Sequence, residues 1–261
     1  MKTKTLRSLV SIGITIFAVT GLYAEISGKT VIENVYNRPV GKTMQADLKM
    51  VITNARGATR EREIVQNSID TNAGDKKIMF FLNPADVRLT SFMTWSWNDG
   101  RDDDQWIYLP ALKRIKRITS DGKTDSFMGS DFTYDDLGDR HPSEDTHSLI
   151  GEEKIDGLDC YVVESIPVVR NNLYVRTITR VLKDSWVGVQ KDFYNGKEEI
   201  VKTLIITRRE KVDGYWVVTD MTMKDLQKGS STRITMENVS FSVALDEPFF
   251  SERQMRLGPR R

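Results

Sequence analysis

The sequence predicts a mainly β protein built on one long antiparallel sheet. Short turn-forming dipeptides recur between runs that are rich in β-branched and aromatic residues, at Asp99-Gly100, Asp121-Gly122, Asp156-Gly157, Asn195-Gly196 and Asp213-Gly214. Such pairs supply the positive φ angles of tight hairpin turns, so consecutive strands should run antiparallel. Apolar and polar residues also alternate along these runs, and helical periodicity is scarce.

Alternation locates the strands. In residues 44–50, apolar side chains alternate with Gln45, Asp47 and Lys49, so one face of this strand is apolar and the other is exposed to solvent. The same pattern predicts further strands at Lys77–Leu82, Leu89–Trp97, Trp106–Leu109, Cys160–Ile166, Leu173–Leu182, Val187–Tyr194, Ile200–Arg208 and Tyr215–Lys224. With no internal repeat and no linker, these strands should form a single domain.

Three segments depart from the plain strand pattern. Apolar residues at helical spacing predict one helix over Ile26–Asn37, before a proline that cannot continue it. In the last strand, Met236 and Val239 have opposite parity, and this change of phase near Asn238 predicts a β-bulge. Residues 129–147 are rich in turn formers and should form a long loop, a feature that in compact domains is usually functional.

The N-terminus has the layout of a secretory signal. A basic start is followed by an uncharged run, Leu9–Tyr23, and cleavage could follow Gly21 or Ala24. An uncleaved anchor is the alternative, but about 15 residues fall short of the ~20 that span a bilayer. We expect residues 1–24 to be a signal peptide and residues 25–261 to be the mature domain.

Charge and cysteine content exclude several classes of protein. The signal holds three of the 38 basic residues and no acidic one, so the mature chain has 35 basic and 37 acidic residues, a net charge of −2. This balance argues against nucleic acid as a partner. Cys160 is the only cysteine, so no internal disulfide can form. A hydrophobic core must therefore stabilise the chain.

No constellation of residues points to catalysis. His141 and His147 are the only histidines, and their spacing matches no common set of metal ligands. The chain lacks a phosphate-binding glycine loop, a cysteine pair and a nucleophile–base set. We therefore expect no enzyme activity, no cofactor and no metal ion.

Methionine and aromatic side chains on the predicted strands suggest a cavity. Methionine adapts to contents of variable shape, and a long sheet that curls commonly encloses a ligand. An ordinary solid core filled by the same side chains is the alternative. The candidates for lining a lipid cavity are Met50, Met79, Trp95, Trp97, Trp106, Tyr108, Met221 and Met223.

Two motifs carry a resemblance to a known family. They are Asp104–Arg114, with the sequence DQWIYLPALKR, and Gly129–Leu137, with the sequence GSDFTYDDL. Together they resemble the outer-membrane lipoprotein-sorting family, which includes relatives of the periplasmic carrier LolA and its receptor LolB. The resemblance extends from the predicted N-terminal helix to Phe250.

The resemblance implies a strongly curved, incompletely closed antiparallel sheet, a half-barrel, with helices and loops forming a lid over a hydrophobic cavity. It implies a periplasmic carrier of lipid or lipoprotein acyl chains, with an inner-membrane transporter and an outer-membrane acceptor as partners. Gly129 and Gly138 would serve as hinges. The lid candidates are Gly129, Asp131, Phe132, Tyr134, Asp136 and Leu137. A non-catalytic β-sheet scaffold of the cell envelope is the alternative function.

Overall fold

A computed structural model describes residues 26–169, 173–241 and 243–259. The expected signal peptide, residues 1–24, lies outside this part of the chain. No helix among the described residues is long and apolar enough to cross a membrane.

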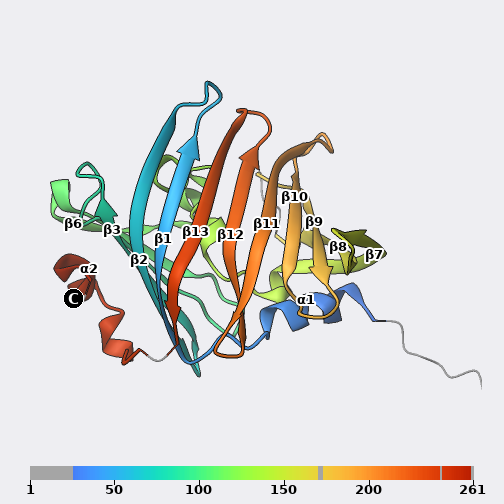
Figure 1. The fold of residues 1–261 in the computed structure, drawn as a ribbon, viewed down its shortest axis with the longest axis horizontal. Helices are drawn as coiled ribbons and strands as arrows, with labels where there is room; N and C mark the ends of the chain where they lie inside the picture. The colour runs from blue at the N-terminus through green and yellow to red at the C-terminus, as the bar shows by residue number, and fades with distance from the viewer. Residues whose placement is uncertain (1–25, 170–172, 242, 260–261) are drawn as a thin grey trace, which may run out of the picture.

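The described residues form a 13-stranded antiparallel sheet in the order β6-β5-β4-β3-β2-β1-β13-β12-β11-β10-β9-β8-β7 (Figure 1). The strands are β1 (Thr43–Thr53), β2 (Thr59–Thr71), β3 (Gly74–Asn83), β4 (Ser91–Trp95), β5 (Asp104–Leu109), β6 (Arg114–Ile118), β7 (Asp145–Ile155), β8 (Leu158–Pro167), β9 (Arg176–Leu182), β10 (Gly188–Tyr194), β11 (Ile200–Val212), β12 (Tyr215–Asp225) and β13 (Ser230–Ser240). The first and last strands pair at the centre, and the sheet stays open between β6 and β7. The prediction of a mainly β, incompletely closed antiparallel sheet is confirmed.

Helices are short and lie around the sheet. Helix α1 (Gly28–Tyr36) confirms the predicted N-terminal helix, and α2 (Glu252–Leu257) near the C-terminus was not predicted. The 3₁₀ helices are η1 (Pro110–Leu112), η2 (Ser120–Thr124), η3 (Phe127–Gly129), η4 (Asp135–Leu137), η5 (Pro142–Glu144) and η6 (Glu247–Phe249).

One long connection joins the two edges of the sheet. Residues 119–144, which we call the crossing segment, run from β6 to β7 and contain η2 to η5. They lie behind the central strands in Figure 1, against the face that we call the inner face. The crossing segment is the only non-hairpin link between consecutive strands in the described part of the chain. The predicted long loop, residues 129–147, forms most of it, but residues 145–147 belong to β7 and the segment begins earlier, at residue 119.

The predicted turns differ in their outcome. Asp156-Gly157 and Asp213-Gly214 form two-residue hairpins in which every φ is positive, between 48° and 88°, as type I′ turns require. Asp99-Gly100 and Asn195-Gly196 lie in longer hairpin loops. Asp121-Gly122 was expected at a hairpin but lies in η2, where it helps to start the crossing segment.

The predicted bulge is present. Asn238 has a φ of 52°, and the β1–β13 register shifts between Gln45, opposite Ser240, and Asp47, opposite Glu237. The extra residue lets both Met236 and Val239 pack against the inner-face core despite their opposite parity.

Three strands were not predicted. Charged residues interrupt the pattern of β2, where Arg62 is nevertheless buried and pairs with Asp86. Strand β7 is largely exposed, and β6 is an edge strand with basic residues on both faces. Strands of this kind show little apolar alternation, which was the signal that located the other strands.

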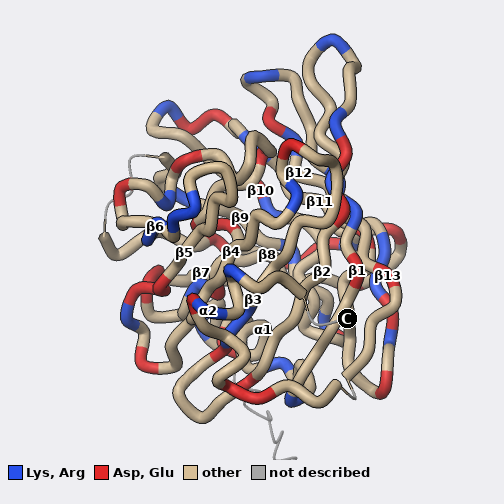
Figure 2. The backbone as a smooth tube through the Cα atoms, turned by 90° about the vertical axis from the view of Figure 1, so that its left-hand side faces the viewer, with Lys and Arg blue, Asp and Glu red and all other residues tan. Residues whose placement is uncertain are grey.

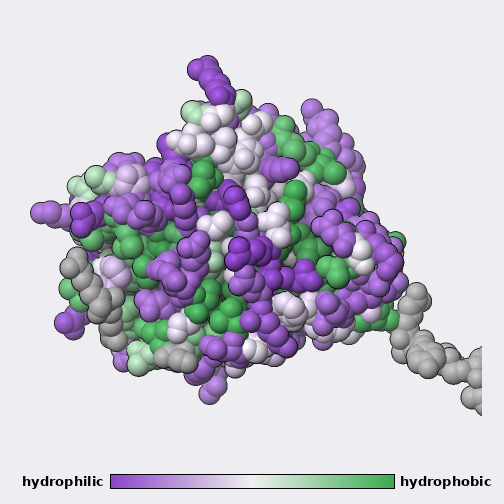
Figure 3. Space-filling view, in the orientation of Figure 1, coloured by the Kyte–Doolittle hydropathy of each residue, from purple (hydrophilic) through white to green (hydrophobic). Residues whose placement is uncertain are grey.

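The sheet buries apolar side chains on both faces, but unevenly. The main core fills the inner face along most of the sheet. On the outer face, a second core lies under the C-terminal segment (residues 245–257), which covers β3, β4 and β5. The outer face of the central strands, turned to the viewer in Figure 3, carries mainly hydrophilic side chains.

The free edge at β6 is strongly basic (Figure 2). Lys113, Arg114, Lys116 and Arg117 are exposed, and Arg117 pairs with Asp104. Positive charge along an edge strand disfavours pairing with the edge of another sheet.

Helix α1 packs tightly on β7, which leads to a prediction. A Cβ added to Gly28 would lie 2.9 Å from the Ser148 Cα and closer still to the Leu149 nitrogen. Alanine ordinarily favours a helix over glycine by up to about 1 kcal/mol, but here the clash with backbone should dominate. Gly28→Ala should lower the free energy of unfolding in urea by about 1–3 kcal/mol.

Gly151→Ala, on β7 itself, is the matched control, because a Cβ added at Gly151 meets no atom within 4 Å. An unchanged or higher stability of Gly28→Ala would contradict the close approach of α1 to β7.

Candidate functional site

Apolar side chains of the crossing segment fill the inner face of the sheet. Phe127, Phe132 and Leu137 are buried there, with exposed fractions of 0%, 3% and 8%. The ring of Phe127 lies 5.1 Å from that of Phe92 and 5.5 Å from that of Tyr134, measured between centroids. The residues that the family resemblance implies as a lid therefore lie against the sheet, and their apolar side chains occupy the centre of the inner-face core.

Asp131 ties the crossing segment to the sheet through polar contacts. Its carboxylate accepts hydrogen bonds from the hydroxyls of Ser230 and Thr232, the latter at 2.7 Å. Its backbone N–H donates to Thr232 Oγ1 at 2.9 Å, and its carbonyl accepts from Lys202 Nζ at 2.7 Å. These partners stand on β11 and β13, so one residue of the segment is bound to two strands.

Asp136 closes a short turn beside this anchor. Its carboxylate accepts from the Thr133 N–H at 2.7 Å, while its own N–H donates to Thr133 Oγ1 at 3.2 Å. Burial raises the pKa of Asp136 and lowers the pKa values of Lys191 and Lys202. Burial therefore disfavours the charged form of each group, and hydrogen bonds and charge pairing must compensate for lost hydration.

The other end of the crossing segment is held by a group of carboxylates. Asp103 Oδ2 accepts from Ser96 Oγ at 2.9 Å and from the Asp139 N–H at 3.1 Å, and Lys77 Nζ lies 3.7 Å from Asp139 Oδ2. A Cβ at Gly138 would collide with the Asp103 carboxylate, so the present position of that carboxylate depends on the missing side chain. Burial raises the pKa of Asp103 to about 6.

Small cavities flank the crossing segment on the inner face. A cavity of about 150 Å³ lies between the crossing segment and β10 to β12, with Phe132, Leu204 and Met223 in its wall. It meets a larger polar depression of about 740 Å³, and Asp135, Gly138 and Arg140 line both. Arg140 is itself fixed by a forked pair of hydrogen bonds to Asp145, at 2.7 and 2.8 Å.

The residues predicted to line one cavity lie on two opposite faces. Met50, Met79 and Met223 are buried in the inner-face core, and Met221 packs against that core. Trp95, Trp106 and Tyr108 instead pack in the outer-face core, and the ring of Trp97 lies 6.0 Å from that of Trp95.

The expectation of a single lining set is therefore corrected. Phe92 and Trp95 have opposite parity on β4, and only Phe92 points to the inner face. A high frequency of aromatic residues in a strand does not reveal which of them lie on the inner face of the sheet. Parity groups the side chains of one strand, but only the tertiary structure says which group faces inward.

Several residues at the inner face were not predicted. Lys202 and Thr232 bind the crossing segment, and Phe81 and Phe127 join its aromatic contacts. Phe127 lies two residues before the recognised motif and could have been found by extending it. Lys202 and Thr232 carry no signal in the sequence, because their partner is about 70 to 100 residues away.

The two histidines serve structural contacts. The side chain of His141 caps η5, and His147 is placed between Ser165 Oγ and the Pro142 carbonyl oxygen, each at 2.8 Å. Within the described ranges, no three His, Cys, Asp or Glu side chains are grouped in a way that could hold a metal ion.

Comparison with known proteins identifies the family. A domain named for outer-membrane lipoprotein sorting, from Vibrio parahaemolyticus, is 31% identical, with a TM-score of 0.83, and the match covers 88% of this chain and 98% of that one. A DUF1329 family protein from Desulfovibrio piger is 30% identical, with a TM-score of 0.82 and coverage of 87% and 97%. This chain belongs to the family of these two proteins, the outer-membrane lipoprotein-sorting-like family.

Two further comparisons complete this placement. A LolA superfamily protein from Nitrosomonas europaea shares the fold of this LolA-like chain at 16% identity, with a TM-score of 0.69 and coverage of 88% and 100%. A family model described as "Uncharacterized protein" matches residues 73–257. None of the curated proteins matches the chain.

The Asp131 anchor leads to a prediction about the lid. Asp131→Ala removes the carboxylate acceptor of Ser230 and Thr232, and loss of such a buried partner costs about 1–3 kcal/mol. Amide hydrogen exchange in residues 127–137 should be faster than in the unmodified protein, whereas exchange in the central strands should not change. Asp121→Ala, an exposed change in the same segment, is the control and should leave exchange unchanged. Equal protection in both variants would show that Asp131 is not the anchor.

The carboxylates near Gly138 predict a dependence on pH. Burial raises the pKa values of Asp75 and Asp103 to about 6 from 3.8, so between these values the folded chain binds more protons than the unfolded chain. The free energy of unfolding should therefore fall as pH rises from 3.8 to about 6. Asp103→Asn should reduce this fall in denaturation curves taken across the range, whereas Asp121→Asn should not. A slope that is the same in all three proteins would contradict the prediction.

Proposed function

We propose that this protein is a periplasmic carrier that shelters an acyl chain of a lipid or lipoprotein on the inner face of its sheet. The observation that carries the proposal is the crossing segment. Its apolar side chains cover the inner face as a cargo chain would, while its attachment to the sheet includes a polar anchor at Asp131 that can be broken and remade. The family relatives include a domain named for lipoprotein sorting.

Cargo uptake on this proposal requires the crossing segment to move. The inner cavity of about 150 Å³ is smaller than ordinary ligand pockets, which measure about 300–1,000 Å³. An acyl chain would take the place of Phe132 and Leu137. Gly129, which has a φ of 75°, and Gly138 flank the segment that would swing.

The same exchange explains how a carrier could release its cargo. Each methylene of an acyl chain contributes about 0.8 kcal/mol when it leaves water. Loading, however, exposes the aromatic side chains of the crossing segment, and unloading buries them again. The net affinity for cargo is the free energy of burying the acyl chain minus the free energy of exposing the aromatic side chains. A partner that contacts the crossing segment could therefore raise or lower this affinity.

The surroundings of the cavity would orient an amphiphilic cargo. Met50, Met79, Met221 and Met223 offer an adaptable apolar wall on the proposed acyl side. The polar depression beside Arg140 would receive the head group. An inner-membrane transporter as donor and an outer-membrane protein as acceptor complete the proposed pathway, and no step in it requires catalysis.

A second candidate is a non-catalytic interaction module of the cell envelope. The observation that favours it is the packing of the inner face, where Phe127 is fully buried and Phe132 nearly so. In such a module the crossing segment would stay in place, and partners would bind elsewhere.

Filling the inner cavity distinguishes the two functions. Leu204 lines the cavity, and Ile205 is the next residue on β11 and has the opposite parity. Leu204→Trp should lower the affinity for a fluorescent fatty-acid probe about tenfold or more, because the indole takes the space of the acyl chain. Ile205→Trp is the matched control and should bind the probe as the unmodified protein does.

Thermal denaturation of both variants would show whether each remains folded. Absence of saturable probe binding to the delipidated, folded protein would overturn the carrier proposal. The interaction module would then be the better account.

A further inference from the structure

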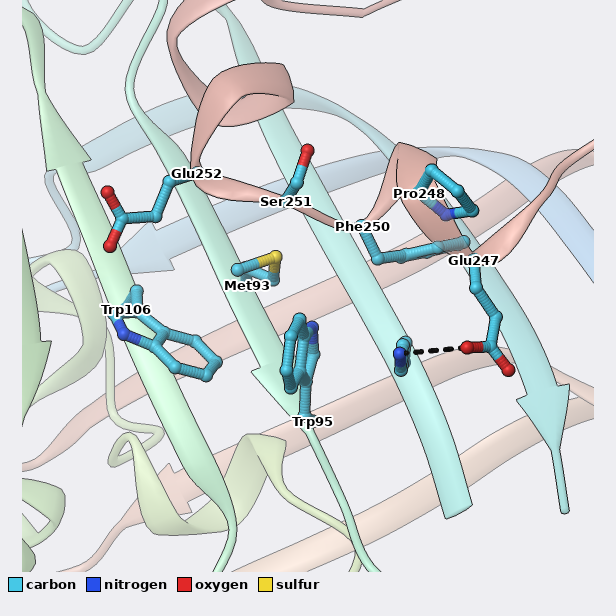
Figure 4. A pocket seen from close by; sticks show the side chains of 9 residues that line it. Met93, Trp95, Trp106, Glu247, Pro248, Phe250, Ser251 and Glu252 are labelled. Atoms are coloured by element: carbon cyan, nitrogen blue, oxygen red, sulfur yellow. Dashed lines mark hydrogen bonds and ion pairs between the residues drawn. The ribbon is translucent and has the colours of Figure 1, made fainter. Parts of the chain in front are cut away.

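The outer face of the sheet carries a second cavity, of about 450 Å³, beneath the C-terminal segment. Figure 4 shows Met93, Trp95 and Trp106 projecting toward this segment from β4 and β5, with Phe250 opposite them. The volume falls within the range of about 300–1,000 Å³ that is typical of small-molecule sites. No residue of the crossing segment lines this cavity, so it is separate from the proposed carrier face.

Aromatic and apolar groups form most of its wall. The rings of Trp95 and Trp106 lie 5.1 Å apart at an interplanar angle of 67°. Met93 and Phe250 beside them are each 1% exposed and provide an apolar floor and roof. Indole faces are electron-rich and attract cations, more strongly where water is excluded.

One end of the cavity already holds an ammonium group from the protein itself. Lys76 Nζ lies 4.4 Å from the centroid of the Trp95 ring and 3.3 Å from Glu247 Oε2, the contact drawn as a dashed line in Figure 4. The Lys76 side chain is 14% exposed, so this contact is largely shielded from water. An indole and a carboxylate therefore hold one cation between them.

The other end has the same two groups. Trp106 and Glu252 both line the cavity, and in Figure 4 they lie on the side away from Glu247. Within the described residues, the ion pair of Glu252 is with Arg256, four residues along, at 3.5 Å. Both side chains of that pair are about half exposed, and pairs of this kind contribute little. Because Lys76 and Glu247 offset each other, Glu252 leaves the lining with a net negative charge.

We propose that this cavity binds an organic cation, an ammonium group carried on a small apolar body. The ammonium lies between Trp106 and Glu252, and the apolar body lies against Met93 and Phe250. A free amine and the choline or ethanolamine head group of a phospholipid share this chemistry. The site goes beyond the proposed carrier function, since its ligand binds on the opposite face of the sheet.

The test uses a cation and its uncharged isostere. Benzyltrimethylammonium should shift the indole N–H resonance of Trp106 in a saturable way when it is titrated into the ¹⁵N-labelled protein. Neopentylbenzene, in which carbon replaces the charged nitrogen, should bind about tenfold more weakly, because it lacks the attraction to the indole and the carboxylate. Glu252→Gln should weaken binding of the cation about tenfold and leave the neutral compound unchanged.

Glu237→Gln makes the same change of charge at an exposed position on β13 and is the control, for which affinity should not change. Since Glu252 is exposed, its replacement should not affect folding, and a fold defect would in any case alter binding of both compounds. Equal affinities for the two compounds would overturn the proposal. So would a Glu252→Gln variant that binds the cation as the unmodified protein does, or a Trp106 resonance that does not shift with any cation.

A third titration identifies the source of the ammonium. Dihexanoylphosphatidylcholine, below its micelle concentration, should bind more tightly than benzyltrimethylammonium if the ligand is a lipid head group, and more weakly if it is a free amine. Either result supports the site, provided that Glu252→Gln weakens it. Leu204→Trp assigns fatty-acid binding to the inner face and Glu252→Gln assigns cation binding to the outer face, so failure of the carrier proposal and failure of this one can be told apart.

Discussion

The structure depends on how an open sheet buries one large apolar face. Thirteen strands that do not close into a barrel leave a row of apolar side chains on the inner face, which must be covered. The chain covers it with its own residues 119–144, and Phe127 and Phe132 insert among the side chains of the sheet. The free energy of burying apolar surface drives this arrangement, and the hydrogen bonds of Asp131 fix its position.

The strand order explains why one segment can cover the whole face. Because β1 and β13 pair at the centre, the chain builds one half of the sheet outward to β6 and the other half inward from β7. The link between the halves must cross from edge to edge, and the shortest way lies over the inner face. A segment across the inner face is thus a consequence of the topology, and the hydrogen bonds of Asp131 and Asp103 hold it there.

The two faces of the sheet differ in their chemistry. The inner face is adaptable, lined by methionines and covered by a segment with glycines at its bends. The outer face under the C-terminal segment is lined by paired indoles and flanked by carboxylates. An acyl chain suits the first because burial alone binds it. A cation suits the second because it requires groups of fixed position and charge.

The sequence by itself determined the elements whose signals are local. Alternation at residues 44–50, the hairpins at Asp156-Gly157 and Asp213-Gly214, the bulge at Asn238 and helix α1 all follow from residues that are neighbours in the chain. The motif at residues 129–137 also indicated the family and a lid. Strands β2, β6 and β7 were missed because charge or exposure weakens their alternation.

Only the tertiary structure decided which way each face points. It placed Trp95 and Trp106 outside and Phe92 inside, and it brought Lys202 and Thr232 to Asp131. Parity divides the side chains of a strand into two sets, but it does not say which set the sheet curves around. That choice depends on contacts between residues far apart in the sequence, because the curvature arises only when all the strands and the crossing segment pack together.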